Sequence, residues 1–267
     1  YYYILNQKSN LNFVGGTILS RQNFDSNFFQ VLSSGTNPNF TNVNGDPVTN
    51  DTEYNFTDIY AGVRYRVKSG IFTFTPGFTA HAYNINNTQF SNEYFKDTFQ
   101  KFLPEFEMIM QFKRSESLQL SYRQQVNFTD VNQIARGVVA NSYNSFFSGN
   151  NNLLNGTFHN ATLFYRSFNL FNNSSVFARI NYRKSMNQVT TDFDFIPGSV
   201  VSTRTNLNNP FDNESLTSFA TVSKTFGKIQ TRIGGNYSYN RNYRFQSATG
   251  NEIITLFYAQ LENGKSK

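Results

Sequence analysis

Two histidines, His81 and His159, are the only ones among the 267 residues, and they are the first candidates for acid–base or metal chemistry. An imidazole needs a carboxylate, a second histidine or a nucleophile beside it to catalyse a reaction or to hold a metal ion. Neither histidine has such a group at ligand spacing, and no glycine-rich phosphate loop occurs. We therefore expect no enzyme, no catalytic residue, no metal site and no cofactor. Both histidines are expected to be polar lining of an interior or of a loop.

Arginines form a more informative set, because they fall at the polar positions of alternating segments. The candidates for lining an interior are Arg64, Arg66, Arg123, Arg166, Arg179, Arg183 and Arg232. Arginine binds carboxylates and phosphates, so one functional hypothesis is a wall that guides anionic or polar solutes or docks an internal domain. The alternative is pairing with Glu105 and Glu107, or with carboxylates of a domain absent from this sequence. The sequence favours the pairing.

The segments that carry these arginines repeat with a period of two, which indicates β-strands with one apolar and one polar face. In 71–82, phenylalanines alternate with threonines and His81, and in 104–113 apolar residues alternate with Glu105 and Glu107. The same alternation occurs in 57–67, 118–128, 176–184 and 229–240. The candidates for contact with lipid are Phe72, Phe74, Phe78, Phe106, Met108 and Phe112.

Short turns and long polar stretches follow one another along the chain. The predicted turns are 7–10, 67–70, 113–117, 168–175, 226–228 and 262–266. The predicted long loops are 23–53, 86–99, 129–156, 190–214 and 241–251. Tight turns at one end of a sheet and long loops at the other are typical of bacterial outer-membrane β-barrels.

The composition permits a membrane barrel although the mean hydropathy is −0.50, because apolar residues at alternate positions still make a complete apolar surface. Predicted strands of about 10–14 residues exceed the usual soluble length and suit a tilted membrane strand. A soluble β-sandwich also alternates and is the competing interpretation. Aromatic residues near strand ends predict a girdle at the lipid headgroups, namely Tyr1, Tyr2, Tyr3, Tyr54, Phe56, Tyr83, Phe128, Tyr237 and Tyr239.

We count about eleven strands, which predicts an all-β fold, an antiparallel transmembrane β-barrel of which residues 1–267 form about half of roughly 22 strands. A complete barrel of about 10–12 strands is the alternative. We interpret the beginning as the end of a strand and 262–267 as a turn with nothing after it, as in a piece of a longer protein. The absence of Cys excludes disulfides and thiolate metal sites. The net charge of +6 is spread without a patch, so we expect no nucleic-acid partner.

Residues 99–190 resemble the C-terminal barrel of TonB-dependent outer-membrane receptors of the Bacteroidetes type. The family has a Pro-led strand, a short charged turn, a strand like LSYR, a long loop and a strand that ends in a Tyr pair. The matching residues are Leu103-Pro104, Leu120-Ser121-Tyr122-Arg123, Gly149-Asn150 and Tyr182-Arg183. Asn151 and Asn155-Gly156 stand where the family has prolines. The match covers about a third of the chain at motif level, by the same barrel pattern.

This resemblance implies a protein of the bacterial outer membrane, surrounded by its lipids, that imports a nutrient or a siderophore- or glycan-type substrate. It implies two partners that this sequence does not contain. One is the protein's own plug domain inside the barrel, and the other is the TonB complex, reached through an N-terminal box. Some relatives also pair with a surface lipoprotein that covers the barrel. The alternative is a barrel subunit of an envelope assembly, structural or secretory, without uptake activity.

Overall fold

The computed structural model describes residues 1–27, 30–32, 34–37, 49–90, 92–195, 200–246, 249–257 and 262–265. The strands are β1 (Tyr2–Asn6), β2 (Ser9–Ser26), β3 (Gln30–Leu32), β4 (Gly35–Asn37), β5 (Asn50–Ser69), β6 (Phe72–Gln89), β7 (Asn92–Lys113), β8 (Glu116–Asn127), β9 (Val138–Ser142), β10 (Ser145–Ser148), β11 (Gly156–Asn169), β12 (Ser174–Met186), β13 (Val189–Phe195), β14 (Ser202–Asn208), β15 (Asn213–Phe226), β16 (Ile229–Gln246), β17 (Thr249–Phe257) and β18 (Glu262–Lys265). The helix α1 spans Val131–Ile134. Within these ranges no helix has the length and apolar character to cross a membrane.

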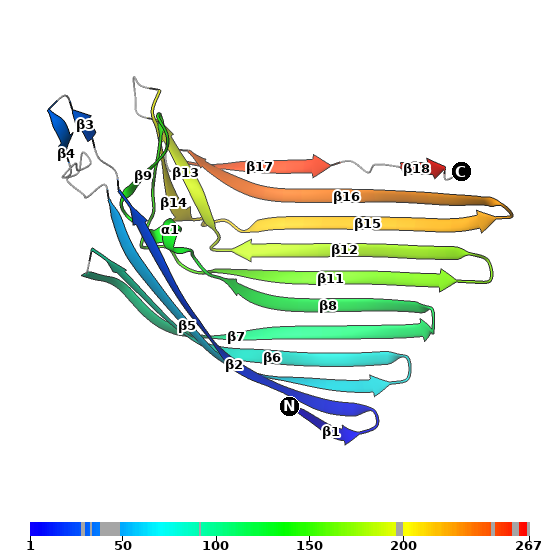
Figure 1. Cartoon of the computed structure of the whole chain (residues 1–267). Coiled ribbons are helices and arrows are strands. Elements are labelled where there is room, and N and C mark those ends of the chain that lie inside the picture. Colours follow the sequence, from blue (N-terminus) through cyan, green and yellow to red (C-terminus); the bar gives the residue numbers. More distant parts are fainter. Residues whose placement is uncertain are drawn as a thin grey trace.

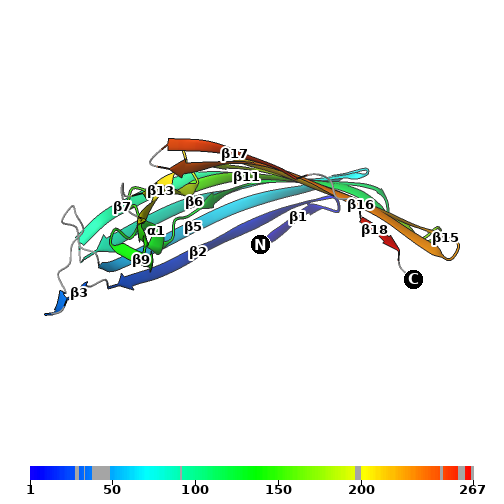
Figure 2. The same cartoon turned by 90° about the horizontal axis from the view of Figure 1, so that it is seen from above.

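One large sheet dominates the part of the chain that the structure describes. Its long strands are neighbours in the order β1-β2-β5-β6-β7-β8-β11-β12-β15-β16, each antiparallel to the next. Both β17 and β18 pair with β16 and together occupy an eleventh strand position, in agreement with the predicted count. Figures 1 and 2 show the sheet as a curved trough rather than a flat layer.

Tight hairpins join the long strands at one end of the sheet, which we call the turn end (right in Figure 1). The predicted turns at 7–10, 67–70, 113–117, 168–175 and 226–228 are confirmed there. At two of them a glycine with positive φ, Gly70 at 60° and Gly227 at 61°, makes the reversal that other residues rarely adopt. The turn predicted at 262–266 is wrong over 262–265, because these residues form β18 against Thr231–Gly234.

The opposite end, which we call the loop end, differs in part from the prediction. Two of the predicted loops are largely strand, since β6 continues to Gln89 before β7 begins at Asn92, and β16 continues to Gln246 before β17. Polar side chains on both faces remove the apolar alternation there, yet the backbone pairs equally well. Predicted loops 129–156 and 190–214 hold α1, β9, β10 and the β13–β14 hairpin. Much of 23–53 lies outside the described residues.

The strand register sorts the side chains onto two faces. One straight row of paired residues crosses the sheet as Arg64, Gly77, Glu105, Arg123, Asn160, Arg183, Ser215 and Asn240. We call the face that carries this row the inner face. The row one residue further along the strands points the opposite way, onto the outer face, as Pro76, Phe106, Tyr122, Ala161, Tyr182, Leu216 and Tyr239.

The outer face is apolar and open over most of the sheet. Phe72, Phe74, Phe78, Phe106 and Met108 share it by register. Phe112, near the irregular end of β7, is exposed. Further exposed side chains on this face are Phe13, Leu19, Ile59, Phe102, Ile180, Tyr182, Val222, Ile233 and Tyr237. A continuous exposed apolar face of this extent needs an apolar environment, but lipid contact of each predicted residue stays a prediction.

The segment 128–155 folds onto the inner face at the loop end. Ile134 of α1 and Leu153 form a buried cluster with Tyr54 and Ile85 of the sheet. Backbone groups of the segment are held by wall side chains, because Asn50 accepts a hydrogen bond from the Gly137 N–H at 2.6 Å and Gln89 donates to the Ile134 carbonyl at 3.1 Å.

Aromatic residues at the loop end form part of this inner packing. Phe56 lies 4.4 Å from Phe128 and 6.0 Å from Tyr83 between ring centroids, and Tyr83 and Tyr54 are buried. The predicted girdle is therefore wrong for Tyr54, Phe56, Tyr83 and Phe128, because they share the face of the polar row. Closeness to a strand end does not determine the face, whereas parity along the strand does. Tyr237 and Tyr239 lie on the outer face as predicted.

Candidate functional site

An ion triad, Arg64–Glu105–Arg123, lies on three neighbouring strands of the inner face. Register brings the residues together, since Glu105 of β7 pairs with Arg123 of β8 on one side and, across Gly77 of β6, faces Arg64 of β5. Gly77 leaves the space they need, because a Cβ there would meet the Arg64 side chain at 2.8 Å. The Glu105 carboxylate accepts hydrogen bonds from Nε and Nη2 of Arg64 and forms an ion pair with Arg123 at 3.2 Å.

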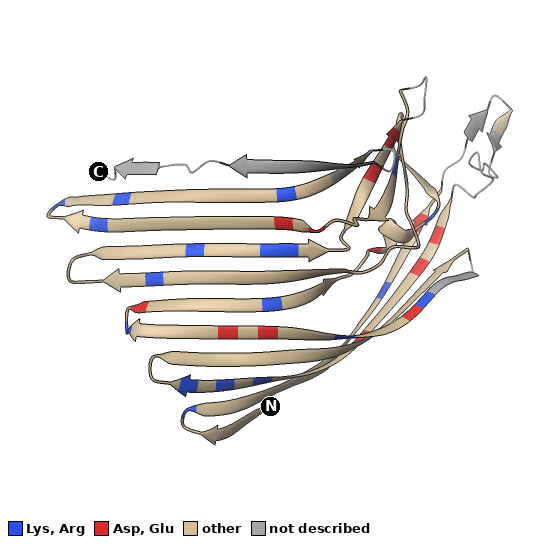
Figure 3. Cartoon of the chain, turned by 180° about the vertical axis from the view of Figure 1, so that it is seen from behind, with Lys and Arg blue, Asp and Glu red and all other residues tan. Residues whose placement is uncertain are grey.

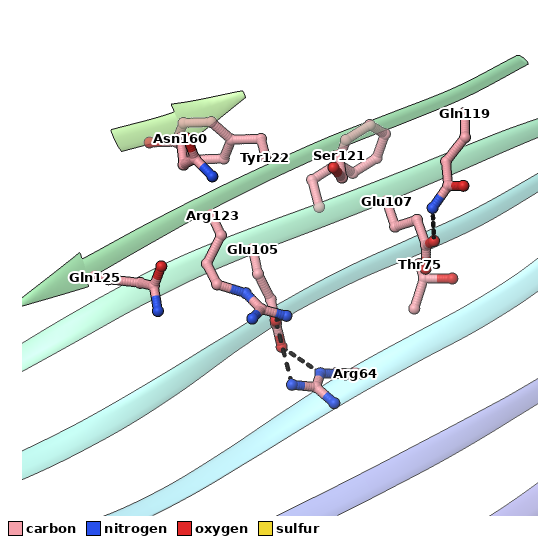
Figure 4. Close-up of a pocket in the computed structure, with 11 residues that line it drawn as sticks. Arg64, Thr75, Glu105, Glu107, Gln119, Ser121, Tyr122, Arg123, Gln125 and Asn160 are labelled. Atoms are coloured by element: carbon pink, nitrogen blue, oxygen red, sulfur yellow. Dashed lines mark hydrogen bonds and ion pairs between the residues drawn. The ribbon is translucent and has the colours of Figure 1, made fainter. Parts of the chain in front are cut away.

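Two hollows share this triad and extend in opposite directions along the inner face. The first, of about 390 Å³, continues past Glu107 to Gln119, whose amide donates to that carboxylate at 2.6 Å. Figure 4 shows the side chains of Arg64, Glu105 and Arg123 converging there. The second, of about 340 Å³, continues to Asp58 and His81. Together they form a polar track on the wall of the trough.

The structure places a carboxylate beside His81 that the sequence did not reveal. Nδ1 of His81 lies 3.0 Å from Asp58, and Nε2 lies 3.1 Å from the Thr79 hydroxyl. The imidazole stacks between Tyr60 and Tyr83, each with a centroid distance of 5.3 Å. Both nitrogens and both ring faces are occupied, so His81 is a built-in part of the wall. The available signal was the hairpin at Gly70, which sets Tyr60 opposite His81 and Asp58 opposite Tyr83.

His159 differs from the prediction, because its register partners put it on the outer face. It pairs with Gln124 and Lys184, and its Nδ1 lies 2.7 Å from the Tyr122 hydroxyl. Among the described residues, no group of three or more His, Cys, Asp or Glu is arranged to hold a metal ion.

The outer face becomes charged toward the loop end, which marks a boundary of the apolar band. Arg21 pairs with Glu53 at 2.6 Å, and Lys184 pairs with Asp212 at 2.8 Å. Hydrogen bonds from Asn55 and Arg21 hold the pKa of the Glu53 carboxyl below its ordinary value of 4.5. Charges that remain paired in water are stable here, whereas the apolar rows below them offer charges no partners.

All seven predicted arginines share the inner face by strand parity. Arg64 and Arg123 pair with Glu105, as the pairing interpretation expected. The others have no carboxylate partner among the described side chains: Arg66, Arg166, Arg179, Arg183 and Arg232. Arg166 donates to the Ser117 hydroxyl at 3.0 Å, and Arg179 donates to the Asn181 amide oxygen at 3.1 Å. The functional role of the set stays a prediction.

No protein-family model matches the sequence, and no curated protein matches it. Two solved structures share the fold. The FrpB iron transporter of Neisseria meningitidis (F3-3 variant) is 12% identical with a TM-score of 0.56, over 90% of this chain and 34% of that one. The hemophore receptor HasR of Serratia marcescens, a double mutant in complex with its hemophore HasA and heme, is 10% identical with a TM-score of 0.60, over 91% of this chain and 40% of that one. This chain therefore has the fold of part of a large antiparallel β-barrel like those of TonB-dependent receptors, and it spans less than half of each matched chain.

Proposed function

We propose that this chain is part of the barrel of a TonB-dependent transporter in the outer membrane of a bacterium, and that the whole protein imports a nutrient. The observation that carries the proposal is the division of one curved sheet into an exposed apolar outer face and a polar inner face. Hydrocarbon offers no hydrogen-bond partners, so a sheet with this outer face is expected to close on itself around its polar side. The likeness to two barrels of receptors supports the same proposal.

The finer assignments rest on weaker support and belong to the same proposal. Residues 99–190 resemble the Bacteroidetes type of the family, and the resemblance adds a plug domain and the TonB complex as partners, with a surface lipoprotein in some relatives. For the substrate, the names of the two matched structures favour an iron-bearing solute over a glycan. No catalytic activity is part of the proposal.

The test uses the full-length protein in its own cells and in detergent. Density-gradient fractions should contain it with outer-membrane markers, and the purified protein should bind the isolated periplasmic domain of TonB. A strain that lacks the gene should grow poorly when a chelator limits iron, and the restored gene should correct this. An outer-membrane protein that does not bind TonB would instead support the barrel subunit of an envelope assembly. A protein recovered in the soluble fraction would refute the membrane barrel.

A further inference from the structure

The inner face carries unequal charge in its two halves. On the half from β5 to β8, Asp58, Glu105 and Glu107 lie among the arginines, and Glu105 pairs with two of them. On the other half, β11, β12 and β16 contain no Asp or Glu. The one carboxylate of β15, Glu214, pairs by register with Lys184 and Arg241 on the outer face. Figure 3 shows β11 and β12 marked by Lys and Arg alone.

Three arginines of this second half lie close together. Arg166 of β11 is directly opposite Phe177, so Arg179 is its diagonal neighbour on β12, about 7–8 Å away between Cα atoms. Arg183 follows four residues later on the same face, about 13 Å along the strand. No carboxylate of the described side chains lies within ion-pair distance of these three. Like charges gathered on one wall repel each other, and the repulsion is relieved when an anionic partner binds.

Aromatic rings lie among these charges and are only partly covered. Phe177 and Phe219 share the inner face with Arg179 and are 38% and 51% exposed. The Arg183 guanidinium lies 4.1 Å from the centre of the Phe158 ring. Arginine with exposed aromatic rings is the composition enriched in protein–protein interfaces. We call Arg166, Arg179, Arg183, Phe177 and Phe219 the arginine wall.

The shape of the arginine wall favours a polypeptide over a small solute. The hollow beside Arg179 and Phe219 measures about 300 Å³, at the lower limit of ligand pockets. The neutral side chains between the arginines bond with one another, since Thr162 donates to Asn181 at 2.9 Å and Asn181 donates to Thr217 at 3.5 Å. These groups leave few polar contacts for a small molecule, whereas the guanidinium groups and rings remain available over several strands.

We infer that the arginine wall is the docking surface for an acidic segment of the same full-length polypeptide, outside residues 1–267, that lies inside the barrel. This inference rests on the proposed function in one respect, because the inner face must enclose an interior. The wall between β5 and β8 supplies its own counter-charges. The arginine wall receives them from the docked segment, whose Asp or Glu side chains pair with Arg179 and Arg183 and whose apolar side chains cover Phe177 and Phe219.

The test replaces single arginines by lysine in the full-length protein, because a lysine amine paired with a carboxylate forms an amide when a water-soluble carbodiimide activates that carboxylate. Arg64→Lys is the matched control, and conditions are set so that it couples to Glu105 within the chain. Arg179→Lys and Arg183→Lys are then treated identically in isolated outer membranes. Mass spectrometry of the digest should show each position joined to an acidic peptide from outside residues 1–267, with loss of the two parent peptides.

The inference is overturned if neither Arg179→Lys nor Arg183→Lys couples to such a peptide under conditions that couple the control. Coupling only to a carboxylate within 1–267, or to another protein, overturns it as well, and no coupling would fit a wall open to free anions. This outcome is separate from the transporter proposal. A protein that fails to bind TonB and still couples at Arg179→Lys would refute the transporter and support the docking surface.

Discussion

Replacing Glu105 by Gln tests whether the ion triad stabilises the barrel. The Glu105 side chain is 13% exposed, whereas those of Arg64 and Arg123 are 37% and 57% exposed. A hydrogen bond to a charged group is worth about 1.5–3 kcal/mol, and an exposed ion pair only about 0.2–1 kcal/mol. Since the carboxylate is nearly buried and its partners are half exposed, we expect Glu105→Gln to lower the free energy of unfolding by about 2 kcal/mol. Arg123→Gln, which removes one exposed contact, should cost about 1 kcal/mol or less.

The measurement is guanidinium unfolding of the full-length protein in phospholipid vesicles, followed by the fraction that migrates as the folded form on unboiled gels. Glu107→Gln is the matched control, two residues away on the same face, because its carboxylate accepts only the amide of Gln119 among the described contacts. A glutamine oxygen can still accept that bond, so we expect a change of about 0.5 kcal/mol. A double-mutant cycle of Arg64→Gln with Glu105→Gln should give a coupling energy of about 1 kcal/mol. Equal effects of Glu105→Gln and Glu107→Gln, or no coupling, would refute the role of the triad.

Three further perturbations test other parts of the structure. Met108→Arg on the outer face should destabilise the folded barrel in vesicles by about 2–4 kcal/mol, whereas Ser121→Arg on the inner face should cost much less; equal costs would contradict the assignment of faces. Gly137→Ala should expose 128–155 to limited proteolysis, because the new Cβ would lie 2.2 Å from the Thr49 carbonyl, while Gly235→Ala, with nothing within 4 Å, should not. The lowered pKa of Glu53 predicts stability that is present above its ordinary value of 4.5 and lost as pH falls through the lower folded value. The melting difference between the wild type and Glu53→Gln should therefore be present at neutral pH and disappear at acid pH; a difference that persists in acid would contradict the pairing.

The side-chain faces could be predicted from the sequence because a strand has a period of two and no tolerance for a slip of one residue. Once Phe72 and Phe74 are assigned to one face, Thr73 and Thr75 must lie on the other, and the register agrees. The arginines followed from the same rule. Their pairing did not, because it depends on which residues of separate strands stand opposite each other. Arg64 and Glu105 are 41 residues apart and meet only across Gly77.

The errors at the loop end have one physical origin. There the strands continue past the apolar band, and both faces become polar or contact other parts of the chain. Asn84 to Gln89 of β6 look like a loop by composition, yet they pair with β5 and β7. Tyr83 and Phe56 look like a girdle by position, yet their face is covered by 128–155. A prediction based on contrast between the faces fails where the surroundings no longer differ.

Whether the arginines pair with neighbours or await a partner has a different answer in each half of the sheet. Glu105 is placed so that one carboxylate serves both Arg64 and Arg123, and this half needs no counter-charge from elsewhere. Beyond β8 the same polar row continues through Asn160 to Arg183 without a carboxylate on the strands that follow. Desolvating unpaired arginines inside a narrow barrel costs free energy, so an internal partner must supply anions on that side or leave it hydrated. A domain filling the trough would therefore bind asymmetrically, held by charge against β11 and β12 and by neutral contacts against β5 to β8. Such a domain could leave the self-neutral side first without separating any ion pair, which makes that side the lower-cost path for a solute.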